Sequence, residues 1–150
     1  MASLKIWLSA VILCTSFFSY GQNKPLKFKT KNITVSKTVL KVAIADNDYK
    51  RARGMMFVEK WSKYQGMLFI FDKAQTRSFW MRNTLLPLSL GFYDAQKRLI
   101  ETFDLTPPIS LAQVTVDKAV SSEPAKYVLE VPQGWFKKHE ITKGSILKGI

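Results

Sequence analysis

The segment Phe79–Thr84 holds the residue types best suited to recognising a ligand. Side chains alternate along a β-strand, so a strand over this segment would place Trp80, Arg82 and Thr84 on one face. An aromatic ring beside a guanidinium and a hydroxyl can bind a sugar or an anionic group. The alternative is that the large side chains only pack in the core, with Arg82 solvated and Asn83 in a turn. We take Trp80, Arg82, Asn83 and Thr84 as candidate ligand-binding residues.

Two further arginines, Arg51 and Arg53, lie on either side of an alanine in a segment predicted to be helical. Residues two positions apart point in different directions on a helix, so at most one of them can face Arg82 across a cleft. If Arg51 does so, the two guanidinium groups would bind a carboxylate or a phosphate through paired hydrogen bonds. Solvation, or an ion pair with Asp48 or Asp104, is the alternative for Arg51. Arg51 therefore joins the candidate site.

Residue counts argue against several types of catalytic or metal site. Cys14 and His139 are the only cysteine and the only histidine, which leaves too few ligands for a typical zinc site. No Gly-x-Ser-x-Gly motif surrounds any serine, so a Ser-His-Asp triad is not indicated. No ligand spacing supports a copper site, and we interpret as core residues the methionines Met55, Met56, Met67 and Met81. We expect no metal site and no cofactor.

Carboxylates are the groups that keep catalysis open. Glu101 and Asp104 are close in sequence, and Asp94 ends the preceding predicted strand. Cleavage of a glycosidic bond requires two carboxyl groups held across a substrate, and the sequence fixes no such pair. The default interpretation is that these side chains are solvated at the ends of strands. No residue is therefore assigned a catalytic role.

Residues 1–21 have the pattern of a secretory signal peptide. Lys5 precedes the apolar stretch Ile6–Phe18, and Ser19–Gly21 presents small residues at a signal-peptidase site. The apolar stretch is shorter than the roughly 20 residues that span a bilayer, so we expect cleavage before Gln22 and a periplasmic or secreted protein. Lysines follow closely, and positive charge beyond an apolar segment tends to stay in the cytoplasm. An uncleaved N-terminal membrane anchor is the alternative.

The chain is strongly basic, with a formal net charge of +12 at pH 7. A positive field favours anionic partners such as acidic polysaccharide or lipid headgroups, although solubility alone also accounts for such a charge. No nucleic-acid-binding signature is present, so we do not expect nucleic acid as a partner. Contact with a membrane is expected only through the signal peptide or the surface charge. The sequence leaves the oligomeric state open.

Hydrophobic patterning predicts many short strands and one or two short helices. Residues 22–36 are expected to form a polar, basic lead-in, with an edge strand as the alternative up to Lys31, and residues 37–150 a single domain. The predicted strands cover residues 39–45, 66–71, 77–81, 88–93, 98–105 and 126–131. Helices are predicted after Asp46–Asp48 and within 134–140. The strands 66–71 and 77–81 are predicted to pair as a hairpin. The fold class is α+β and β-rich, with a small curled or barrel-like sheet.

Several motifs resemble, in order and spacing, the signature of the bacterial and archaeal family called domain of unknown function 192. They are Arg51–Met56, Gly66–Phe71, Phe79–Thr84, Pro87-Leu88, Val128–Val131, Gly134 and Ile141–Gly144. The resemblance covers nearly all of the chain after Gln22 and implies a compact β-rich fold that often follows a signal peptide. It implies no established activity. This chain has Ser89 and Ser145 where the family commonly has aspartate, which weakens a catalytic hypothesis.

Two functional hypotheses follow from these residues. The first is an exported, non-catalytic binding or accessory protein that recognises an anionic or carbohydrate component of the cell envelope near Trp80, Arg82, Asn83 and Arg51. The second is an enzyme that acts on such a substrate through an arginine clamp and a carboxylate. We favour the first hypothesis, because no pair of carboxylates is fixed by the sequence.

Overall fold

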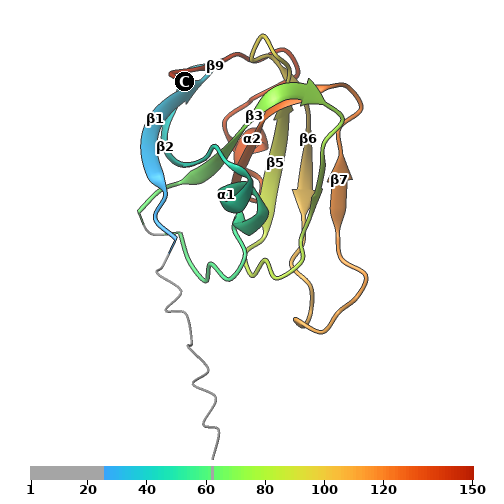
Figure 1. Ribbon diagram of the computed structural model, residues 1–150. Helices are drawn as coiled ribbons and strands as arrows, with labels where there is room; N and C mark the ends of the chain where they lie inside the picture. Colours follow the sequence, from blue (N-terminus) through green and yellow to red (C-terminus); the bar gives the residue numbers. More distant parts are fainter. Residues whose placement is uncertain (1–25, 62) are drawn as a thin grey trace, which may run out of the picture.

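The structure is a computed structural model that describes residues 26–61 and 63–150. Within these residues the chain forms nine strands and two short helices (Figure 1). The elements are, in chain order, β1 (Lys29–Val35), β2 (Thr38–Ala45), α1 (Asp48–Arg53), β3 (Gly66–Gln75), β4 (Ser78–Trp80), β5 (Leu88–Tyr93), β6 (Leu99–Leu105), β7 (Lys118–Val120), β8 (Ala125–Pro132), α2 (Trp135–Lys138) and β9 (Leu147–Lys148).

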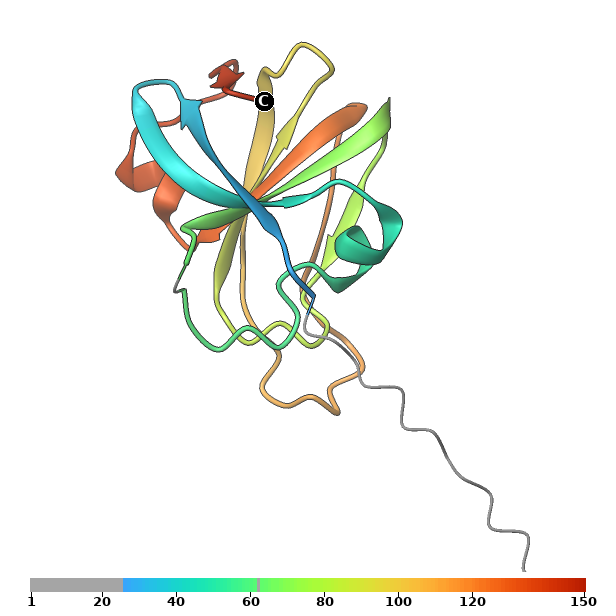
Figure 2. The same cartoon turned by 60° about the vertical axis from the view of Figure 1, so that its left-hand side comes forward.

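Seven strands form one sheet in the order β6-β5-β8-β3-β2-β1-β9. The sheet curls into a half-barrel, which is clearest where β1 and β2 turn away from the other strands (Figures 1 and 2). The remaining two strands, β4 and β7, pair with each other as a separate antiparallel ribbon, here called the β4–β7 ribbon. The predicted fold class, a β-rich domain with a curled sheet and one or two short helices, is confirmed.

The first hairpin, β1 with β2, begins earlier than the domain boundary that we expected at residue 37. All of β1 lies inside the segment 22–36, and it pairs in antiparallel register with β2 from Lys29 to Val35. Ile33 and Val35 are buried, whereas the first four residues of β1 are exposed. The two apolar side chains at the end of an otherwise polar segment therefore tie it into the sheet.

The connection between β2 and β3 contains α1 and makes the two strands parallel. The Asn47 side chain accepts a hydrogen bond from the Lys50 backbone N–H at 3.0 Å, which caps the helix where the sequence predicted its start. The helix ends at Gly54, whose φ of 47° is a left-handed conformation, and the Gly54 N–H donates to the Lys50 carbonyl. A Cβ at this position would lie 3.3 Å from the Phe69 ring. Glycine therefore lets the chain turn close above Phe69.

Apolar side chains cover both faces of the large sheet. One cluster surrounds α2 and includes Leu129, Val131, Trp135 and Phe136. The other lies on the side of α1 and the β4–β7 ribbon and includes Met67, Phe69, Leu90 and Val128. The first four residues of β3 are all buried, as expected for an apolar run without alternation. This strand is therefore central in the fold.

The predicted hairpin between residues 66–71 and 77–81 is wrong. The strand β3 pairs with β2 on one side and with β8 on the other, so neither of its edges is free for β4. Instead β4 pairs with β7, with Phe79 opposite Ala119. The sequence analysis missed β7, because only Ala119 of its three residues is buried and the strand carries no clear alternation.

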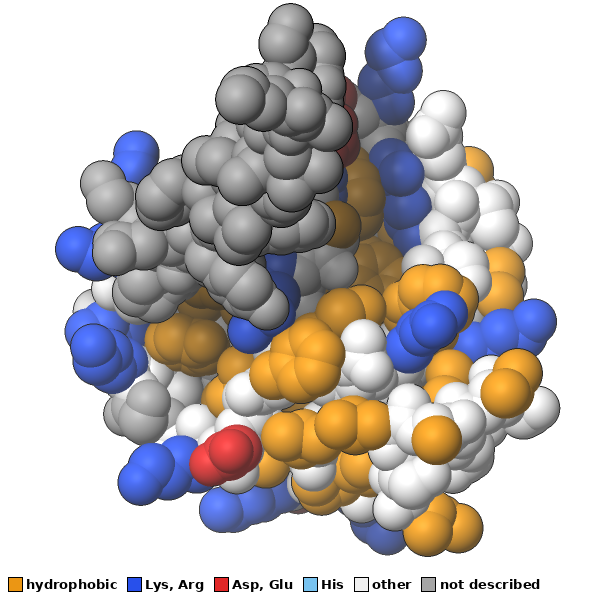
Figure 3. Space-filling view, turned by 60° about the horizontal axis from the view of Figure 1, so that its bottom comes forward, with side chains coloured by type: hydrophobic (Ala, Val, Ile, Leu, Met, Phe, Trp, Pro, Cys, Tyr) orange, Lys and Arg blue, Asp and Glu red, His pale blue; other side chains and the backbone are white. Residues whose placement is uncertain are grey.

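The end of the molecule that Figure 3 faces has apolar side chains among scattered Lys and Arg side chains. The β6–β7 connection reaches this end (Figure 1) and contains the exposed side chains of Ile109, Leu111 and Val114. In residues 26–61 and 63–150, no helix is long and apolar enough to cross a membrane. The predicted signal peptide, residues 1–21, lies outside the described residues.

Candidate ligand-binding site

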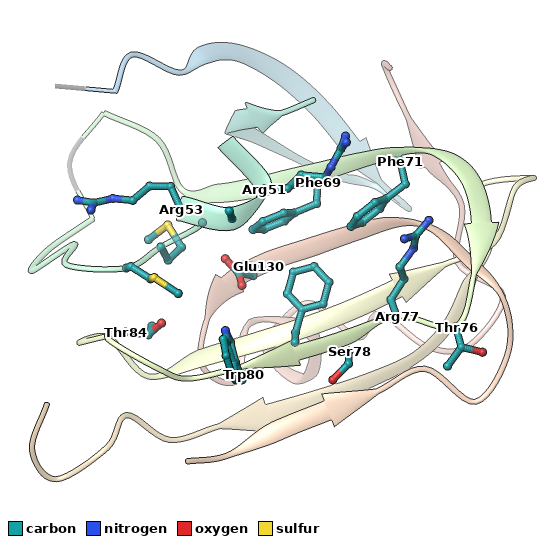
Figure 4. A pocket seen from close by; sticks show the side chains of 15 residues that line it. Arg51, Arg53, Phe69, Phe71, Thr76, Arg77, Ser78, Trp80, Thr84 and Glu130 are labelled. Carbon is teal, nitrogen blue, oxygen red and sulfur yellow. The ribbon is translucent and has the colours of Figure 1, made fainter. Parts of the chain in front are cut away.

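A cavity of about 400 Å³ lies between α1 with its following turn, the strands β3 and β8, and the β4–β7 ribbon (Figure 4). Its lining combines aromatic rings, arginines, two methionines and one carboxyl group. The side chains come from four stretches of sequence, around residues 51–56, 69–71, 76–84 and 130. The curvature of the sheet and the cover formed by the β4–β7 ribbon bring these stretches together.

Aromatic rings form one wall of the cavity. Phe79 on β4 packs edge to face against Phe69 on β3, with ring centroids 4.9 Å apart, and against Phe71 at 6.4 Å. These contacts hold the β4–β7 ribbon onto the large sheet. Trp80, the next residue on β4, also lines the cavity but is 56% exposed, so one part of its indole faces solvent. This wall of the cavity is therefore apolar, and an accessible aromatic ring lies at its mouth.

Two guanidinium groups lie over the ring of Phe71. The Arg51 guanidinium carbon is 5.1 Å from the ring centroid, and that of Arg77 is 3.8 Å from it. Arg51 donates to the Ile70 carbonyl at 2.7 Å and to the Asp48 carboxylate at 2.6 Å, and its side chain is only 14% exposed. Arg77 donates through Nε to the Ala125 carbonyl at 3.3 Å. Both side chains are therefore held in place by the backbone of the domain.

The charges of the two arginines act on each other. Burial lowers the pKa of the Arg77 guanidinium from its ordinary value, and the nearby positive charge of Arg51 lowers it further. The Arg77 guanidinium stays cationic at neutral pH, because its ordinary pKa lies far above it. The expected partner of Arg51 across the cleft was Arg82, whereas the structure places Arg77 beside it. The sequence analysis did not single out Arg77, which lies in the short connection between β3 and β4.

The structure brings three of the five predicted ligand-binding residues to the cavity, namely Arg51, Trp80 and Thr84. Arg82 lies outside the lining, with its guanidinium carbon 5.7 Å from the centroid of the Trp80 ring. Asn83 is also outside it and has a left-handed φ of 56°, and its carbonyl accepts a hydrogen bond from the Phe57 N–H at 2.8 Å. The proposed alternation of side chains through Thr84 fails, because β4 ends at Trp80 and the chain then turns.

A buried carboxyl group, that of Glu130, borders the cavity and points into it (Figure 4). Glu130 lies on β8, opposite Met67 of β3 and Leu90 of β5, and is 7% exposed. Its Oε2 atom has no hydrogen-bond partner among the described residues. Burial raises the pKa of the Glu130 carboxyl from 4.5 to about 8. The carboxyl is therefore largely neutral at pH 7.

Sequence reasoning missed Glu130, because a glutamate that alternates with apolar residues is typical of the solvent-facing side of a strand. One signal was available. The residue lies in the run Tyr127–Val131, in which all the side chains except that of Glu130 are apolar or aromatic. Such a run is typical of a strand that is covered on both faces.

The other polar residues considered from the sequence lie away from this cavity. Asp94 pairs with Arg98 at 2.9 Å, and Glu101 accepts hydrogen bonds from the backbone and side chain of Ser122. Ser89 donates to Asp104 and accepts from the Gly134 N–H at 2.8 Å. The serine at position 89 therefore joins β5, β6 and the turn before α2, rather than contributing to the cavity. Among the described residues, no group of three or more His, Cys, Asp or Glu could hold a metal ion.

The methionines divide between the core and the cavity. Met67 and Met81 are buried, whereas Met56 lines the cavity and Met55 does both. Thioether side chains are polarisable and adapt to different shapes, so they suit the wall of a binding site as well as a core. The single histidine also lies away from the cavity. The ring centroids of His139 and Trp135 are 4.7 Å apart, at the end of α2.

The half-barrel and its cavity define a small β-rich domain with one candidate ligand site. Residues 27–149 match the model of the family described as Uncharacterized ACR, COG1430, or domain of unknown function 192. The chain belongs to this family. The resemblance noted in the motifs is thereby confirmed over nearly the whole chain. A comparison with curated proteins found no match.

Two solved structures are similar to this chain. One, from Sinorhizobium meliloti 1021, is described as a "putative transcription regulator"; it has a TM-score of 0.73 and 25% identity, and the match covers 84% of this chain and 98% of that one. The other, from Novosphingobium aromaticivorans DSM 12444, is described as a protein of unknown function. It has a TM-score of 0.72 and 24% identity, with 83% of this chain and 89% of that one covered. Both likenesses support the fold.

Proposed function

We propose that the chain is an exported binding protein that holds a small anionic ligand, such as an acidic or phosphorylated carbohydrate of the cell envelope. The observation that carries this proposal is that two immobilised arginines, Arg51 and Arg77, meet an aromatic wall in one cavity. Acidic sugars and sugar phosphates combine a negative charge with a ring, and such a cavity suits both parts.

The arginine pair supports an anionic ligand, because each guanidinium keeps donors that no described residue uses. A guanidinium carries five N–H donors, and Arg51 and Arg77 each donate to two acceptors among the described residues. The carboxylate of Asp48 that pairs with Arg51 is fully exposed, with a relative exposure of 100%. Exposed ion pairs contribute little free energy, so a ligand anion could bind Arg51 at small cost.

Trp80 supports a ring-shaped body for the ligand. Its indole is the accessible aromatic surface at the cavity mouth, and Arg82 lies beside it on the outer side. The faces of sugar rings carry C–H groups that pack on aromatic rings, while the polar edges remain free for hydrogen bonds. The basic surface of the domain would also attract anionic ligands over a distance, and this attraction falls with ionic strength.

Export is proposed from residues 1–21 alone. Cleavage before Gln22 would release a protein that works in the periplasm or outside the cell, and retention of the segment would leave it anchored at its N-terminus. N-terminal sequencing of the protein from the cell envelope distinguishes the two forms. A chain that starts at Gln22 supports export, whereas a chain that starts at Met1 supports the anchor.

The binding proposal is tested by calorimetric titration of the full chain with N-acetylglucosamine 1-phosphate at low ionic strength. We expect saturable binding that weakens with added salt, and at least tenfold weaker binding in the variant Arg77→Gln, because one charge-assisted contact is lost. Neutral N-acetylglucosamine should bind more weakly than the phosphate. Trp80→Ala should weaken the binding of the sugar phosphate more than that of inorganic phosphate, because only the sugar can contact the Trp80 indole ring.

The matched control for this experiment is Arg98→Gln. Arg98 is a half-exposed arginine that pairs with Asp94 and lies outside the cavity lining. Its loss lowers the net charge of the protein by the same amount as the loss of Arg77. Equal weakening in both variants would mean that binding depends on overall charge, and unchanged binding in folded Arg77→Gln would refute the proposed site.

One observation favours the alternative of an enzyme, since a carboxyl group with a raised pKa, that of Glu130, borders the same cavity. Such groups serve as general acids. Glu130 is the one acidic residue among the described residues that line the cavity, so a mechanism with two carboxylates has no second group there. Mass spectrometry of envelope glycans after incubation with the protein tests this alternative. New products that disappear with Glu130→Gln would support it.

A further inference from the structure

We propose that Glu130, as a neutral carboxylic acid, donates a hydrogen bond to an uncharged oxygen of the ligand while the ligand's anionic group binds Arg51 and Arg77. The inference rests on the proposed function and narrows the ligand class. The ligand would carry an anionic group at one end and, at the other, an ether or carbonyl oxygen, which accepts but cannot donate a hydrogen bond. Sugar phosphates and sugar acids have both features.

The position of Glu130 in the sheet argues for a ligand-directed role. Its neighbours on the adjoining strands, Met67 and Leu90, are apolar and fully buried. A carboxyl group that served only the fold would be expected to pair with a donor, since unpaired buried polar groups are destabilising. Glu130 Oε2 has no such donor among the described residues, and the side chain points into the cavity (Figure 4). A ligand atom in the cavity would supply the missing partner.

The two ends of the cavity differ in chemistry, as Figure 4 shows. Arg77 lies beside Phe71 at one end, whereas Glu130 lies toward the end that carries Thr84 and Trp80. Phe69 and Phe79, whose centroids are 4.9 Å apart, form the apolar wall that runs along the cavity. Arg53 also lies toward the Glu130 end, with its guanidinium carbon 4.9 Å from the Phe57 ring centroid. A ligand that fills the cavity would therefore meet the Arg51–Arg77 pair at one end and the Glu130 donor at the other.

The titratable and charged groups near Glu130 leave it protonated. Arg51 and Arg53 on α1 and Arg77 before β4 line the same cavity, and Tyr64 in the connection to β3 interacts electrostatically with Glu130. Burial is the cause of the raised pKa of Glu130, and no arginine offsets it. The pKa of Tyr64 is raised by burial and then by the charge of Glu130, so Tyr64 stays neutral as well.

The neutral carboxyl fixes the sign of the pH dependence. Binding through its O–H group requires the proton, which is present well below pH 8 and lost as the pH rises through the pKa of about 8. Above that pKa the affinity for the ligand should fall up to tenfold per pH unit, because the ligand binds the protein with protonated Glu130 and this form becomes scarcer as the pH rises. Ionised Glu130 would also face a lone pair of the ligand oxygen. An ammonium ligand is disfavoured, because the arginines repel it.

The experiment titrates the full chain with N-acetylglucosamine 1-phosphate between pH 7 and 9.5, where most of the phosphate ester is already doubly ionised. We expect wild-type affinity to be constant near pH 7 and to fall by about tenfold or more by pH 9.5. The variant Glu130→Gln keeps an uncharged donor and should bind with no decline over this range. Inorganic phosphate, which lacks the second contact, should show no such decline with either protein.

Glu101→Gln is the matched control, because Glu101 is a glutamate on the same sheet that lies outside the cavity lining. This variant should keep the wild-type pH profile. Two outcomes overturn this inference and leave the proposed function standing. In the first, sugar phosphate binding needs Arg77 but its affinity does not fall with rising pH. In the second, the affinity of Glu130→Gln falls with pH as much as that of wild type. Absence of binding by wild-type protein overturns both the inference and the proposed function.

A second measurement follows the titration of the Glu130 carboxyl directly, first in the free protein and then with the ligand. Carbon-13 NMR of the side-chain carboxyl should show Glu130 titrating near pH 8, and addition of the sugar phosphate should move that titration to higher pH, since the ligand binds the protonated form. Titration near pH 4.5 in the free protein would overturn the inference. A shift to lower pH on binding would do so too, because it would mean that the ligand prefers the ionised carboxylate.

Discussion

The two faces of the large sheet are both buried, but they are filled in different ways. On the α2 side, Phe136 lies so close to the sheet that a Cβ added at Gly91 would be 2.5 Å from its ring. On the α1 side, the β4–β7 ribbon stands over the sheet and leaves the cavity between them. Among the described residues, each face holds one buried side-chain polar atom without a hydrogen-bond partner, the Tyr93 hydroxyl on the α2 side and Glu130 Oε2 on the α1 side. Only the second borders this cavity.

This difference separates a face that stabilises the fold from a face that leaves room for a ligand. A phenolic hydroxyl is neutral over the whole physiological range, and burial raises the pKa of Tyr93 further. A buried carboxyl, in contrast, is neutral only while its surroundings keep it so. The α1 side therefore carries a group whose state depends on pH and on what occupies the cavity.

The largest expected effect concerns the α2 side. Phe136→Ala should destabilise the fold by about 3–5 kcal/mol, because it removes a buried ring that packs against Gly91 and Trp135. Urea denaturation followed by circular dichroism measures this loss. The variant Phe79→Ala on the other side should cost less, since Phe79 is only partly buried and borders an existing space. An equal cost on both sides would contradict the contrast between the two faces.

The next effect concerns the stability cost of Glu130. Its pKa is about 8 in the folded protein and ordinary, near 4.5, when unfolded. The stabilising contribution of the protonated form is fully present below pH 4.5 and is lost as the pH rises toward 8. Glutamine does not titrate, so Glu130→Gln should gain stability relative to wild type between these pH values, by up to about 1.4 kcal/mol per pH unit until the gain levels off above pH 8.

Denaturation of both proteins at pH 4.5, 6.5 and 8.5 measures this difference. Glu101→Gln provides the control, since Glu101 accepts hydrogen bonds from Ser122 and lies outside the cavity lining. A constant difference between Glu130→Gln and wild type at the three pH values would show that Glu130 is not held neutral by the fold.

The smallest effect concerns α1, which carries Arg51 to the cavity. Asn47→Ala removes the side chain that caps this helix and should cost about 1 kcal/mol. Because the helix has six residues and no buried residue, fraying would also release Arg51 from its contact with Ile70. Asn47→Asp, which keeps a capping oxygen, should restore stability. Denaturation measures the cost, and weaker phosphate binding in Asn47→Ala alone would report the fraying.

The sequence predicted the local features of the fold well. The capping residue before α1, the unbroken apolar run of β3 and the turn before β6 are signals that depend on neighbouring residues, and each element forms where it was expected. The pairing of β4 with β7 depends on residues about 40 positions apart, and it could not be read from a three-residue strand with one buried side chain.

The same limit explains which parts of the candidate site were predicted. Arg51, Trp80 and Thr84 were singled out by their residue types and reach the cavity. Arg77 was not predicted. Nothing in the sequence around it indicates that its guanidinium and that of Arg51 both lie over the Phe71 ring of β3. Glu130 was missed because its burial depends on the cover formed by α1 and the β4–β7 ribbon. The one local signal was the apolar run Tyr127–Val131 around it.

The separate pairing of the β4–β7 ribbon has a consequence for how members of this family can diverge. The ribbon supplies Phe79 and Trp80 to the cavity, yet it shares no strand pairing with the seven-stranded sheet. Substitutions at its exposed positions, such as Trp80, leave the hydrogen bonds and the α2-side core of the sheet intact. The side chains at the mouth of the cavity can therefore change at a few ribbon positions while the foldability of the domain is conserved.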